Sequence, residues 1–355
     1  MTLDKLRRRI DELDAHLVEL LNARTKAAID IGQVKQANGQ AIYVPAREKA
    51  VLERVAELNT GPLTAQSLCA IYREIMSAAL ALEHDLKIAY LGPSATFTHQ
   101  AARARFGASV EYTACQTISD VFAAVQKGTA DYGVVPIENS TEGAVTHTLD
   151  EFMDTPLRIC AEIYLRITHH LMAAGPVEGI KRLYSNPQVF GQCRRWLAEN
   201  MPQVDLVPVS STARAAEMAA QEPDSGALAS ELAAELYGLT VWHHDIQDIS
   251  GNTTRFLVVG AQYGEPTGND KTSICFGVKH RAGALCAALD VLRKHGLNMT
   301  KIESRPSKTR QWEYVFFVDV EGHAADTKVA EALNELNEHC AVVTILGAYP
   351  RIPNG

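Results

Sequence analysis

The sequence has 355 residues, of which 46% are hydrophobic and 21% charged, and this ordinary composition excludes a disordered chain, a fibrous repeat and a disulfide-stapled miniprotein. Such a length predicts two or three domains. The formal net charge is −8 and no Lys/Arg tract occurs, which argues against a nucleic-acid-binding protein. No stretch approaches the ~18 consecutive apolar residues of a membrane span, and the charged start does not resemble a signal peptide. We therefore expect a cytoplasmic protein without a membrane partner.

Cysteine and histidine provide few candidate metal ligands. The seven cysteines are scattered and form no CxxC pair, which predicts reduced side chains and no zinc site. The histidine pairs at 169–170 and 243–244 invite a metal hypothesis. Adjacent side chains of a strand point to opposite faces, so neither pair is a natural chelate. We expect no metal and no cofactor.

Residues 1–84 show helical periodicity and no strand pattern. Apolar side chains recur with a helical period from about Leu3 to Ala37, which predicts one helix of about 35 residues. Two further helices are expected over about 45–58 and 64–84. They are too short to cover the apolar stripe of the first helix. The pattern therefore predicts an intertwined helical dimer.

Basic residues of the long helix form a candidate anion site. Arg24 and Lys35 are eleven residues apart, so at ~100° per residue they lie on nearly the same face, ~16 Å apart along the axis. Arg7 lies too far along the helix to join them, but the Arg7 of a second, antiparallel copy could reach the site. Arg47 and Glu48 begin the second helix. From spacing alone, solvated charges are the simpler interpretation of that pair.

Residues 86–262 alternate short apolar strands with helices, which predicts mostly parallel sheets covered by helices. Crossings near 155–175 and 240–250 divide them into two lobes, with a cleft suited to a small molecule. Four polar segments follow strands here: 92–98 (GPSATFT), 135–143 (VPIENSTEG), 185–193 (SNPQVFGQC) and 251–256 (GNTTRF). Such segments can point backbone N–H groups and hydroxyls at an anion, although ordinary capped turns share the pattern.

The last domain follows a polar linker at 262–270 that contains glycine and proline. Residues 272–351 read as strand, helix, two strands, helix and strand. This order predicts a ferredoxin-like βαββαβ unit, in which an antiparallel sheet carries two helices on one face. The sequence is thus divided into domains at 1–84, 86–262 and 272–351.

These segments resemble, in order, the motifs of one protein family. Residues 6–35 (LRRRIDELDAHLVELLNARTKAAIDIGQVK) resemble the first helix of the all-helical, type II chorismate mutases. The four middle segments resemble the GPxG(T/S)(F/Y)(S/T), PIENS, S(H/N)PQ…QC and TRF motifs of prephenate dehydratases, with Ala95 in place of a glycine. Residues 283–286 (GALC) and 303–306 (ESRP) resemble the GALV and ESRP motifs of ACT domains, with Cys286 in place of valine. The whole chain resembles the bacterial P-proteins, which fuse chorismate mutase, prephenate dehydratase and an ACT domain.

The resemblance implies an all-α, intertwined mutase dimer, a two-lobed α/β dehydratase domain like the periplasmic binding proteins, and a regulatory ACT domain. In the mutase site it implies that Arg24, Arg47 and the partner subunit's Arg7 hold the carboxylates of chorismate. It further implies that Lys35 faces the ether oxygen and that Glu48 binds the ring hydroxyl.

The mutase segment departs from the family pattern where Val44, Ala78 and Leu82 stand in place of polar residues. Glu83 is the nearest polar candidate on the third helix. If a protonated Glu83 donates to the ether oxygen, mutase activity should fall as the pH rises above the pKa of Glu83.

In the dehydratase site, the resemblance implies that the hydroxyl of Thr254 assists the departure of the ring hydroxyl of prephenate, with Glu138 as an alternative acid. Arg255 or a helix N-terminus would bind a carboxylate. The other candidate substrate-binding residues are Thr96, Thr98, Asn139, Ser140, Ser185, Gln192 and Thr253.

The ACT resemblance implies that L-phenylalanine, the end product, binds between copies of this domain and inhibits the enzyme. The candidate effector-binding residues are Gly283, Ala284, Leu285, Glu303, Ser304, Arg305 and Pro306. The expected partners are chorismate, prephenate, L-phenylalanine and further copies of the chain, in a homodimer or a tetramer.

Two other functions remain open at this point. One is a prephenate dehydratase whose vestigial mutase domain only dimerises, because three mutase positions depart from the family pattern. The other is a non-enzymatic amino-acid sensor, built from a binding-protein-like cleft and an ACT domain. The presence of Thr254, Arg255, Glu138 and Asn139 favours an enzyme over the sensor.

Overall fold

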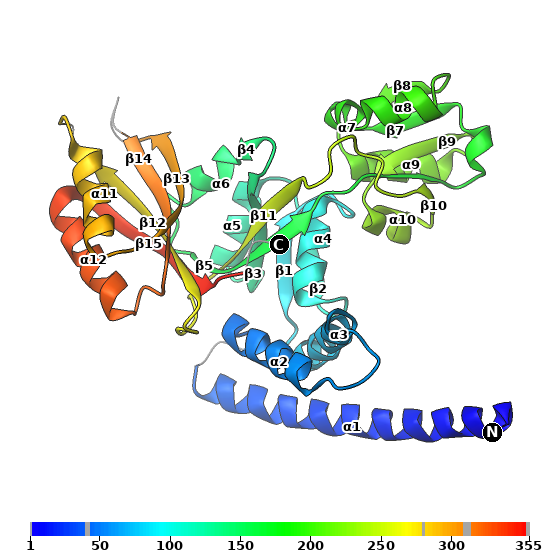
Figure 1. Cartoon of the computed structure of the whole chain (residues 1–355), viewed down its shortest axis with the longest axis horizontal. Helices are drawn as coiled ribbons and strands as arrows, with labels where there is room; N and C mark the ends of the chain where they lie inside the picture. Colours follow the sequence, from blue (N-terminus) through cyan, green and yellow to red (C-terminus); the bar gives the residue numbers. More distant parts are fainter. Residues whose placement is uncertain (1, 40–42, 279–280, 308–313, 353–355) are drawn as a thin grey trace. The chain divides into compact units, whose positions relative to one another are not determined.

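The computed structural model describes residues 2–39, 43–278, 281–307 and 314–352, and the chain forms two compact units (Figure 1). Unit 1 comprises Met1–Lys87 and Arg105–Glu111, and unit 2 comprises Ile88–Ala104 and Tyr112–Gly355. This grouping differs from the division drawn on the sequence, because residues 105–111 associate with the helical segment. Within the described residues, no helix is long and apolar enough to cross a membrane.

Unit 1 contains the three helices that the apolar periodicity predicts. They are α1 (Leu3–Ala37), α2 (Pro45–Leu58) and α3 (Ala65–Glu83). The fixed φ of Pro45 suits the first turn of α2, and the side chain of Thr64 caps α3 by accepting from the amide of Ser67. Residues 107–109 dock on α3, where the amide of Ala108 donates to Glu74 at 3.0 Å. This contact explains why the segment belongs to unit 1.

The apolar stripe of α1 is largely uncovered in the single chain. Figure 1 shows α1 extending past α2 and α3 towards its N-terminus. Leu6, Ile10, Leu13 and Leu17 are between 42% and 59% exposed along that stretch. An amphipathic helix buries its apolar stripe against another element, and in the single chain most of this stripe has no such cover.

Unit 2 contains two β-sheets. The strand order is β13-β14-β12-β15-β5-β11-β3-β1-β2 in the larger sheet, where β4 pairs with β3, and β10-β6-β9-β7-β8 in the smaller. The strands that precede the C-terminal domain are β1 (Lys87–Leu91), β2 (Glu111–Cys115), β3 (Tyr132–Asn139), β4 (Gly143–Ala144), β5 (Arg158–Arg166), β6 (His170–Ala173), β7 (Arg182–Ser185), β8 (Asp205–Pro208), β9 (Ser225–Ala229), β10 (Thr240–His243) and β11 (Thr253–Gly260).

The sheets of the two lobes are mixed, whereas the sequence predicted mostly parallel strands. Neighbours such as β1–β3 and β7–β9 are parallel. Other neighbours are antiparallel: β11 pairs in this way with β3 and β5, and β6 with β9 and β10. The two crossings contain the strands β5, β6 and β10, which the alternation of strand and helix did not reveal.

The helices of the two lobes follow most of these strands. They are α4 (Phe97–Phe106), α5 (Ile118–Gln126), α6 (Thr146–Glu151), α7 (Pro187–Gln192), α8 (Arg194–Asn200), α9 (Thr212–Gln221) and α10 (Glu231–Tyr237), with a 3₁₀ turn at Val177–Gly179. Side-chain caps begin several of them, including a capping box between Thr117 and Asp120 at α5 and Ser211 at α9. Separate apolar cores hold the two lobes, one around Phe122 and one around Leu183.

The C-terminal domain has the predicted βαββαβ order. Its elements are β12 (Asp270–Val278), α11 (Ala284–Lys294), β13 (Met299–Pro306), β14 (Tyr314–Glu321), α12 (Thr327–His339) and β15 (Cys340–Pro350), and an apolar core joins both helices to the sheet. Its sheet continues into that of the first lobe, because β15 pairs with β5 where Gly347 meets Ile159. A Cβ atom at position 347 would lie 2.2 Å from the carbonyl oxygen of Ile159, so this junction requires glycine.

Candidate active sites

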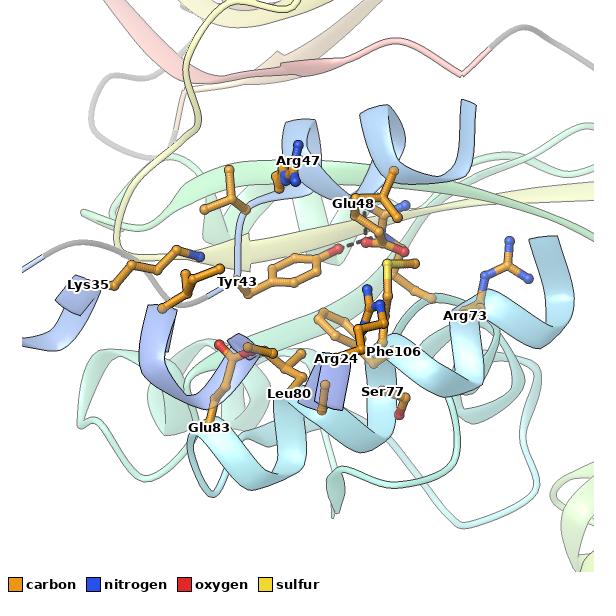
Figure 2. Close-up of a pocket in the computed structure, with 17 residues that line it drawn as sticks. Arg24, Lys35, Tyr43, Arg47, Glu48, Arg73, Ser77, Leu80, Glu83 and Phe106 are labelled. Carbon is orange, nitrogen blue, oxygen red and sulfur yellow. Dashed lines mark hydrogen bonds and ion pairs between the residues drawn. The ribbon is translucent and has the colours of Figure 1, made fainter. Parts of the chain in front are cut away.

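A cavity of about 360 Å³ lies in unit 1 (Figure 2). Its lining includes Arg24 and Lys35 of α1, Arg47 and Glu48 of α2, and Glu83 of α3. The eleven-residue spacing does bring Arg24 and Lys35 to one cavity, as helical geometry predicts. Arg7 does not line this cavity in its own chain. Its delivery by a second copy stays a prediction.

Glu83 of α3 lies against Gly32 of α1. A Cβ atom on Gly32 would lie 3.1 Å from Cγ of Glu83 and 3.2 Å from its Oε2, so the glycine of α1 makes room for this carboxyl group. Burial raises the pKa of Glu83, and the positive charges of Lys35 and Arg24 offset part of that rise. The protonated form of Glu83 therefore persists to higher pH than that of an ordinary glutamate.

Helix α3 presents a different face to the cavity from the one expected. The residues that line it recur at spacings of three and four, at Met76, Ala79, Leu80 and Glu83. Ala78 and Leu82 are exposed and do not line it. The departures from the family pattern at these two positions therefore do not change this wall, whereas Val44 does line the cavity.

The sequence analysis did not assign several further lining residues, among them Tyr43, Arg73, Arg105 and Phe106. The guanidinium of Arg105 lies 3.1 Å from Oε2 of Glu48 and donates from Nε to the hydroxyl of Tyr43. No spacing argument within residues 1–84 could reveal Arg105, because it lies outside them. Arg73 lines the same cavity as Glu83 from α3, so helical spacing from Glu83 could have predicted it.

A second cavity, of about 320 Å³, lies in unit 2 and is lined by both lobes. All four polar segments of the dehydratase-like region contribute to it. Of the candidate residues, the cavity brings together Thr96, Thr98, Asn139, Gln192 and Thr254. Four segments spread along the chain thus meet in one place, which is the strongest indication that they act together.

Thr254 of β11 lies directly opposite Asn139 of β3 in the sheet register. The side-chain amide of Asn139 donates to Oγ1 of Thr254 and to Oδ1 of Asn252, both at 2.8 Å. Its carbonyl oxygen accepts from the backbone amides of Thr141 and Glu142, which fixes the orientation of the Asn139 side chain. Because Oγ1 of Thr254 accepts from Asn139, its own proton can be donated into the cavity.

Glu138 and Arg255, which are candidate residues of the dehydratase site, lie on the other face of the sheet from this cavity. The two residues pair with each other in the sheet, next to Asn139 and Thr254, and neither lines the cavity. Successive side chains of a strand point to opposite faces, so their neighbours face the cavity and they do not. Glu138 instead forms an ion pair with Lys301 at 2.6 Å. A role as the alternative acid or as the carboxylate-binding arginine would therefore require a side chain that this cavity does not contain.

Three more candidate residues lie near the cavity without lining it. Ser185 is buried and donates to the carbonyl oxygen of Leu228 at 2.8 Å. Ser140 accepts from the amide of Thr253 at 3.0 Å, which ties the end of β3 to the start of β11. Ser185, Ser140 and Thr253 therefore support the site and do not contribute side chains to its wall.

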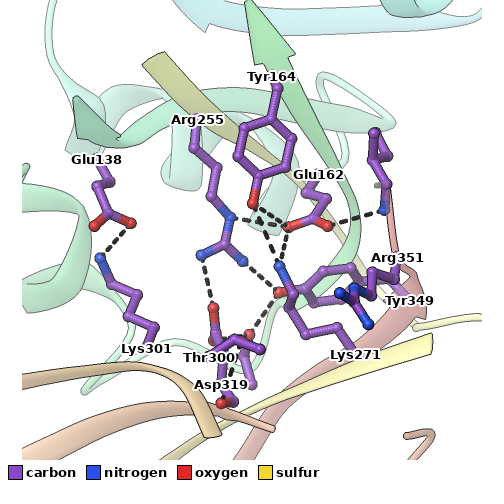
Figure 3. A network of polar contacts seen from close by, with 12 residues as sticks. Glu138, Glu162, Tyr164, Arg255, Lys271, Thr300, Lys301, Asp319, Tyr349 and Arg351 are labelled. Atoms are coloured by element: carbon purple, nitrogen blue, oxygen red, sulfur yellow. Dashed lines mark hydrogen bonds and ion pairs between the residues drawn. The ribbon is translucent and has the colours of Figure 1, made fainter. Parts of the chain in front are cut away.

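Arg255 is the centre of a buried ionic network (Figure 3). Its guanidinium donates to Glu162 at 2.9 Å, to Asp319 at 2.6 Å and to the hydroxyl of Tyr349 at 2.9 Å. Burial alone would raise the pKa of Asp319, but the charge of Arg255 and a hydrogen bond from Ser273 hold it below its usual value. The network joins β11 to β14 and β15 of the C-terminal domain.

Replacing Arg255 by methionine is expected to destabilise unit 2 by about 3–5 kcal/mol, because two buried carboxylates lose their shared cation. The urea midpoint of unfolding and the thermal midpoint should both fall. Dehydratase kinetics measured well below the transition should show little change in the KM for prephenate. A large rise in KM with unchanged stability would instead return Arg255 to the substrate site.

The second cavity also contains residues that the sequence analysis did not assign. His169 is 2% exposed, and its Nε2 lies 2.8 Å from Oε1 of Gln192. Burial lowers the pKa of His169, which keeps the ring neutral. His170, the first residue of β6, does not line the cavity and packs against the ring of His244. Within the described residues, no group of three or more metal-ligating side chains occurs.

The lining of this cavity contains the carboxylate of Glu142 but no lysine or arginine side chain, within the described ranges. The rest of its polar lining consists of hydroxyl, amide and imidazole side chains, and some of these lie at helix starts. Ser211 caps α9, and Thr96 accepts from the amide of His99 at the start of α4. The run Ser210-Ser211-Thr212 between a strand and a helix could have predicted the cap of α9 from the sequence. Such helix starts can hold a carboxylate through neutral donors.

The motif residues of the C-terminal domain occupy a helix start and a strand end. Gly283 precedes α11 with φ of +77°, which suits glycine, and residues 303–306 end β13. Arg305 forms a bidentate ion pair with Asp150 of α6, with N···O distances between 2.9 and 3.1 Å. Its guanidinium therefore joins the C-terminal domain to the first lobe. Effector binding by these residues stays a prediction.

Comparisons with known proteins agree with this geometry. Three family models match in chain order: Chorismate mutase type II at 6–84, Prephenate dehydratase at 88–263 and ACT domain at 272–338. A bifunctional chorismate mutase/prephenate dehydratase from Aquifex aeolicus is 49% identical over 354 residues, which cover 98% of each chain.

Two solved structures each resemble 75% of the chain. The prephenate dehydratase of Arthrobacter aurescens in complex with L-Phe is 36% identical, with a TM-score of 0.68, over 75% of this chain and 90% of that one. GqqA, described as a novel type of quorum quenching acylase, is 32% identical, with a TM-score of 0.69, over 75% and 98%. The fold of unit 2 is thus shared with enzymes of known structure.

Proposed function

Because the chain belongs to the family of bifunctional chorismate mutase/prephenate dehydratases, we propose that it acts as a homodimer under feedback control by L-phenylalanine. It carries both activities of that family, the rearrangement of chorismate to prephenate and the conversion of prephenate to phenylpyruvate. The meeting of all four dehydratase segments at one cavity is the observation that carries most weight. A biosynthetic role of this kind supports a cytoplasmic location.

The mutase reaction is a rearrangement within one molecule, so the protein needs to bind, orient and stabilise charge rather than form a covalent bond. Arg24 and Arg47, together with the partner subunit's Arg7, would hold the two carboxylates. Lys35 would stabilise the negative charge that develops on the ether oxygen, and Glu48 would accept from the ring hydroxyl. The retention of this charged cavity favours an active mutase over a vestigial one.

Mutase kcat/KM is expected to fall as the pH rises through the raised pKa of Glu83, because only the protonated carboxyl can donate to the ether oxygen. The Glu83→Gln variant keeps a donor that does not titrate, so this limb of the pH profile should disappear. The profile should be measured from chorismate consumption at subsaturating substrate. A limb that persists unchanged in Glu83→Gln would assign the titration to another group.

The dehydratase reaction removes carbon dioxide and hydroxide from the prephenate dianion and leaves phenylpyruvate, a monoanion with an aromatic ring. Electrons of the breaking C–CO₂ bond complete the ring as the C–O bond to the hydroxyl breaks. Thr254 would donate its proton as a hydrogen bond to the departing oxygen, and Asn139 fixes the orientation of Thr254. The absence of cationic side chains from the described lining suits a carboxylate that must leave as a neutral molecule.

Control by L-phenylalanine is supported by the connections between the C-terminal domain and the catalytic strands. Strands β3 and β11 carry Asn139 and Thr254 on the cavity face and Glu138 and Arg255 on the other. Glu138 binds Lys301 of the C-terminal domain, and Arg255 binds Asp319 of the same domain. A shift of that domain on effector binding would therefore act on the strands that hold the catalytic pair. Coupling of this kind is reciprocal, so prephenate should change the affinity for phenylalanine.

The regulatory proposal is tested by measuring prephenate turnover across a titration of L-phenylalanine, with L-alanine as the control amino acid. Sedimentation velocity at the same concentrations reports the assembly. We expect inhibition by phenylalanine alone and a dimer or larger assembly. Turnover that is insensitive to phenylalanine would contradict the proposed regulation. A monomer would contradict the proposal that the exposed stripe of α1 forms the subunit contact.

A further inference from the structure

We propose that Arg105 is a positioning residue of the mutase site, which holds the carboxylate of Glu48 where it accepts the ring hydroxyl of chorismate. The inference rests on the mutase function proposed above. It adds a residue from outside the segment that matches the mutase family, which ends at residue 84. Arg105 and its neighbour Phe106 are the last two residues of α4, and both line the cavity of unit 1.

The side chain of Arg105 is held on two sides. Its Nη2 lies 3.1 Å from Oε2 of Glu48, and its Nε donates to the hydroxyl of Tyr43 at 2.5 Å. The guanidinium carbon lies 5.7 Å from the centroid of the Tyr43 ring, which packs in turn on Phe106 with 4.8 Å between centroids. The guanidinium group therefore has one orientation, and it is directed at Glu48.

Glu48 retains hydrogen-bonding capacity although its charge is balanced. Its side chain is 11% exposed, and its Oε2 is buried without a hydrogen-bond partner among the described residues. The contact with Arg105 is thus a close ion pair without the alignment of a hydrogen bond. A buried carboxylate oxygen in this state is stabilised by a donor supplied from the cavity. The hydroxyl group on the ring of chorismate is such a donor.

The cations that line the cavity have two different roles. The charged residues that line it besides Glu48 are Arg24, Lys35, Arg47, Arg73, Glu83 and Arg105. The ion pair recorded for Glu48 is with Arg105. Arg105 can therefore compensate Glu48, while Arg24, Lys35 and Arg47 act on the substrate. Without Arg105, the carboxylate of Glu48 would lose the cation that pairs with it and holds it in place.

The test uses the full-length protein and the variants Arg105→Gln, Arg105→Lys and Arg103→Gln. Arg103 is the matched control, because it lies on the same helix and pairs with Glu235 instead of lining the cavity. Mutase and dehydratase kinetics are measured on the same preparation. In Arg105→Gln we expect the KM for chorismate to rise about tenfold, with kcat within about threefold of wild type.

A second readout is rescue by the conservative variant. Arg105→Lys keeps a cation beside Glu48, so we expect its KM for chorismate to return to within about threefold of wild type. Arg103→Gln should match wild type in every mutase parameter, and all three variants should keep wild-type dehydratase kinetics.

Mutase kinetics of Arg105→Gln that equal those of Arg103→Gln would overturn the proposal, and so would equal losses of both activities. If Arg105→Gln fails to fold, the single variant Glu48→Gln is compared with the double variant Glu48→Gln/Arg105→Gln. The double variant contains neither charge, so this comparison tests the proposal in its place. We expect the second substitution to change KM less than about twofold in that background, and a tenfold change would refute an action through Glu48. A wild-type protein that leaves chorismate unchanged refutes the mutase function itself, and this proposal with it.

Discussion

Replacing Lys35 by alanine is expected to lower mutase kcat by a factor of about 10²–10³, because the charge that develops on the ether oxygen loses its cation in a partly buried site. Dehydratase kinetics should not change, since Lys35 lies in unit 1 and the second cavity is lined by unit 2 alone. The loss of chorismate absorbance reports the first activity and the formation of phenylpyruvate the second. Lys26→Ala is the control, because Lys26 is an exposed lysine of the same helix.

The same variant shows whether the partner subunit's Arg7 completes the site. Arg7→Ala and Lys35→Ala should each be nearly inactive as mutases. When the two proteins are unfolded together and refolded, half of the dimers are mixed, and one of the two sites in each mixed dimer is intact. Activity should then recover to about a quarter of that of wild type. A mixture that stays inactive would mean that Arg7 does not act across the dimer.

Replacing Thr254 by valine is expected to lower dehydratase kcat by a factor of about 10²–10⁴, because the departing hydroxide loses its hydrogen-bond donor. Valine keeps the shape of threonine, and the mutase should be unaffected. Thr253→Val is the matched control, because Thr253 is the adjacent residue of β11 and does not line the cavity.

Phenylpyruvate formation from prephenate, followed by its absorbance in alkali, measures both variants. A Thr254→Val protein within threefold of wild type would remove Thr254 from the mechanism. An equal loss in Thr253→Val would show that the substitutions damage the strand rather than the reaction.

The helices of the first unit follow from the sequence almost to the residue. The apolar period predicted a helix from about Leu3 to Ala37 and another over about 45–58, which are the bounds of α1 and α2. Local periodicity sufficed here because each helix shows one apolar face. The wall of the cavity on α3 did not follow as well, since an offset of one residue rotates a side chain by ~100° and replaces Glu83 by Leu82.

The motifs of the second unit do not by themselves show which side chains of a strand face the cavity. Thr254 and Arg255 are adjacent, as are Glu138 and Asn139, and a motif does not state which member of each pair faces the cavity. That depends on register, because a shift by one residue reverses every side chain of a strand. Arg105 could not be predicted from the sequence for another reason. Its partners Tyr43 and Glu48 are distant in sequence, so their contact is a property of the folded chain alone.

The most direct test of the whole account is to supply the wild-type protein with chorismate as its sole substrate and to follow chorismate, prephenate and phenylpyruvate together. We expect chorismate to disappear, prephenate to rise and fall, and phenylpyruvate to accumulate, with the last step suppressed by L-phenylalanine. Turnover of added prephenate without any loss of chorismate would reduce the helical segment to a dimerisation domain. A protein that converts neither substrate would contradict the assignment of both cavities as active sites.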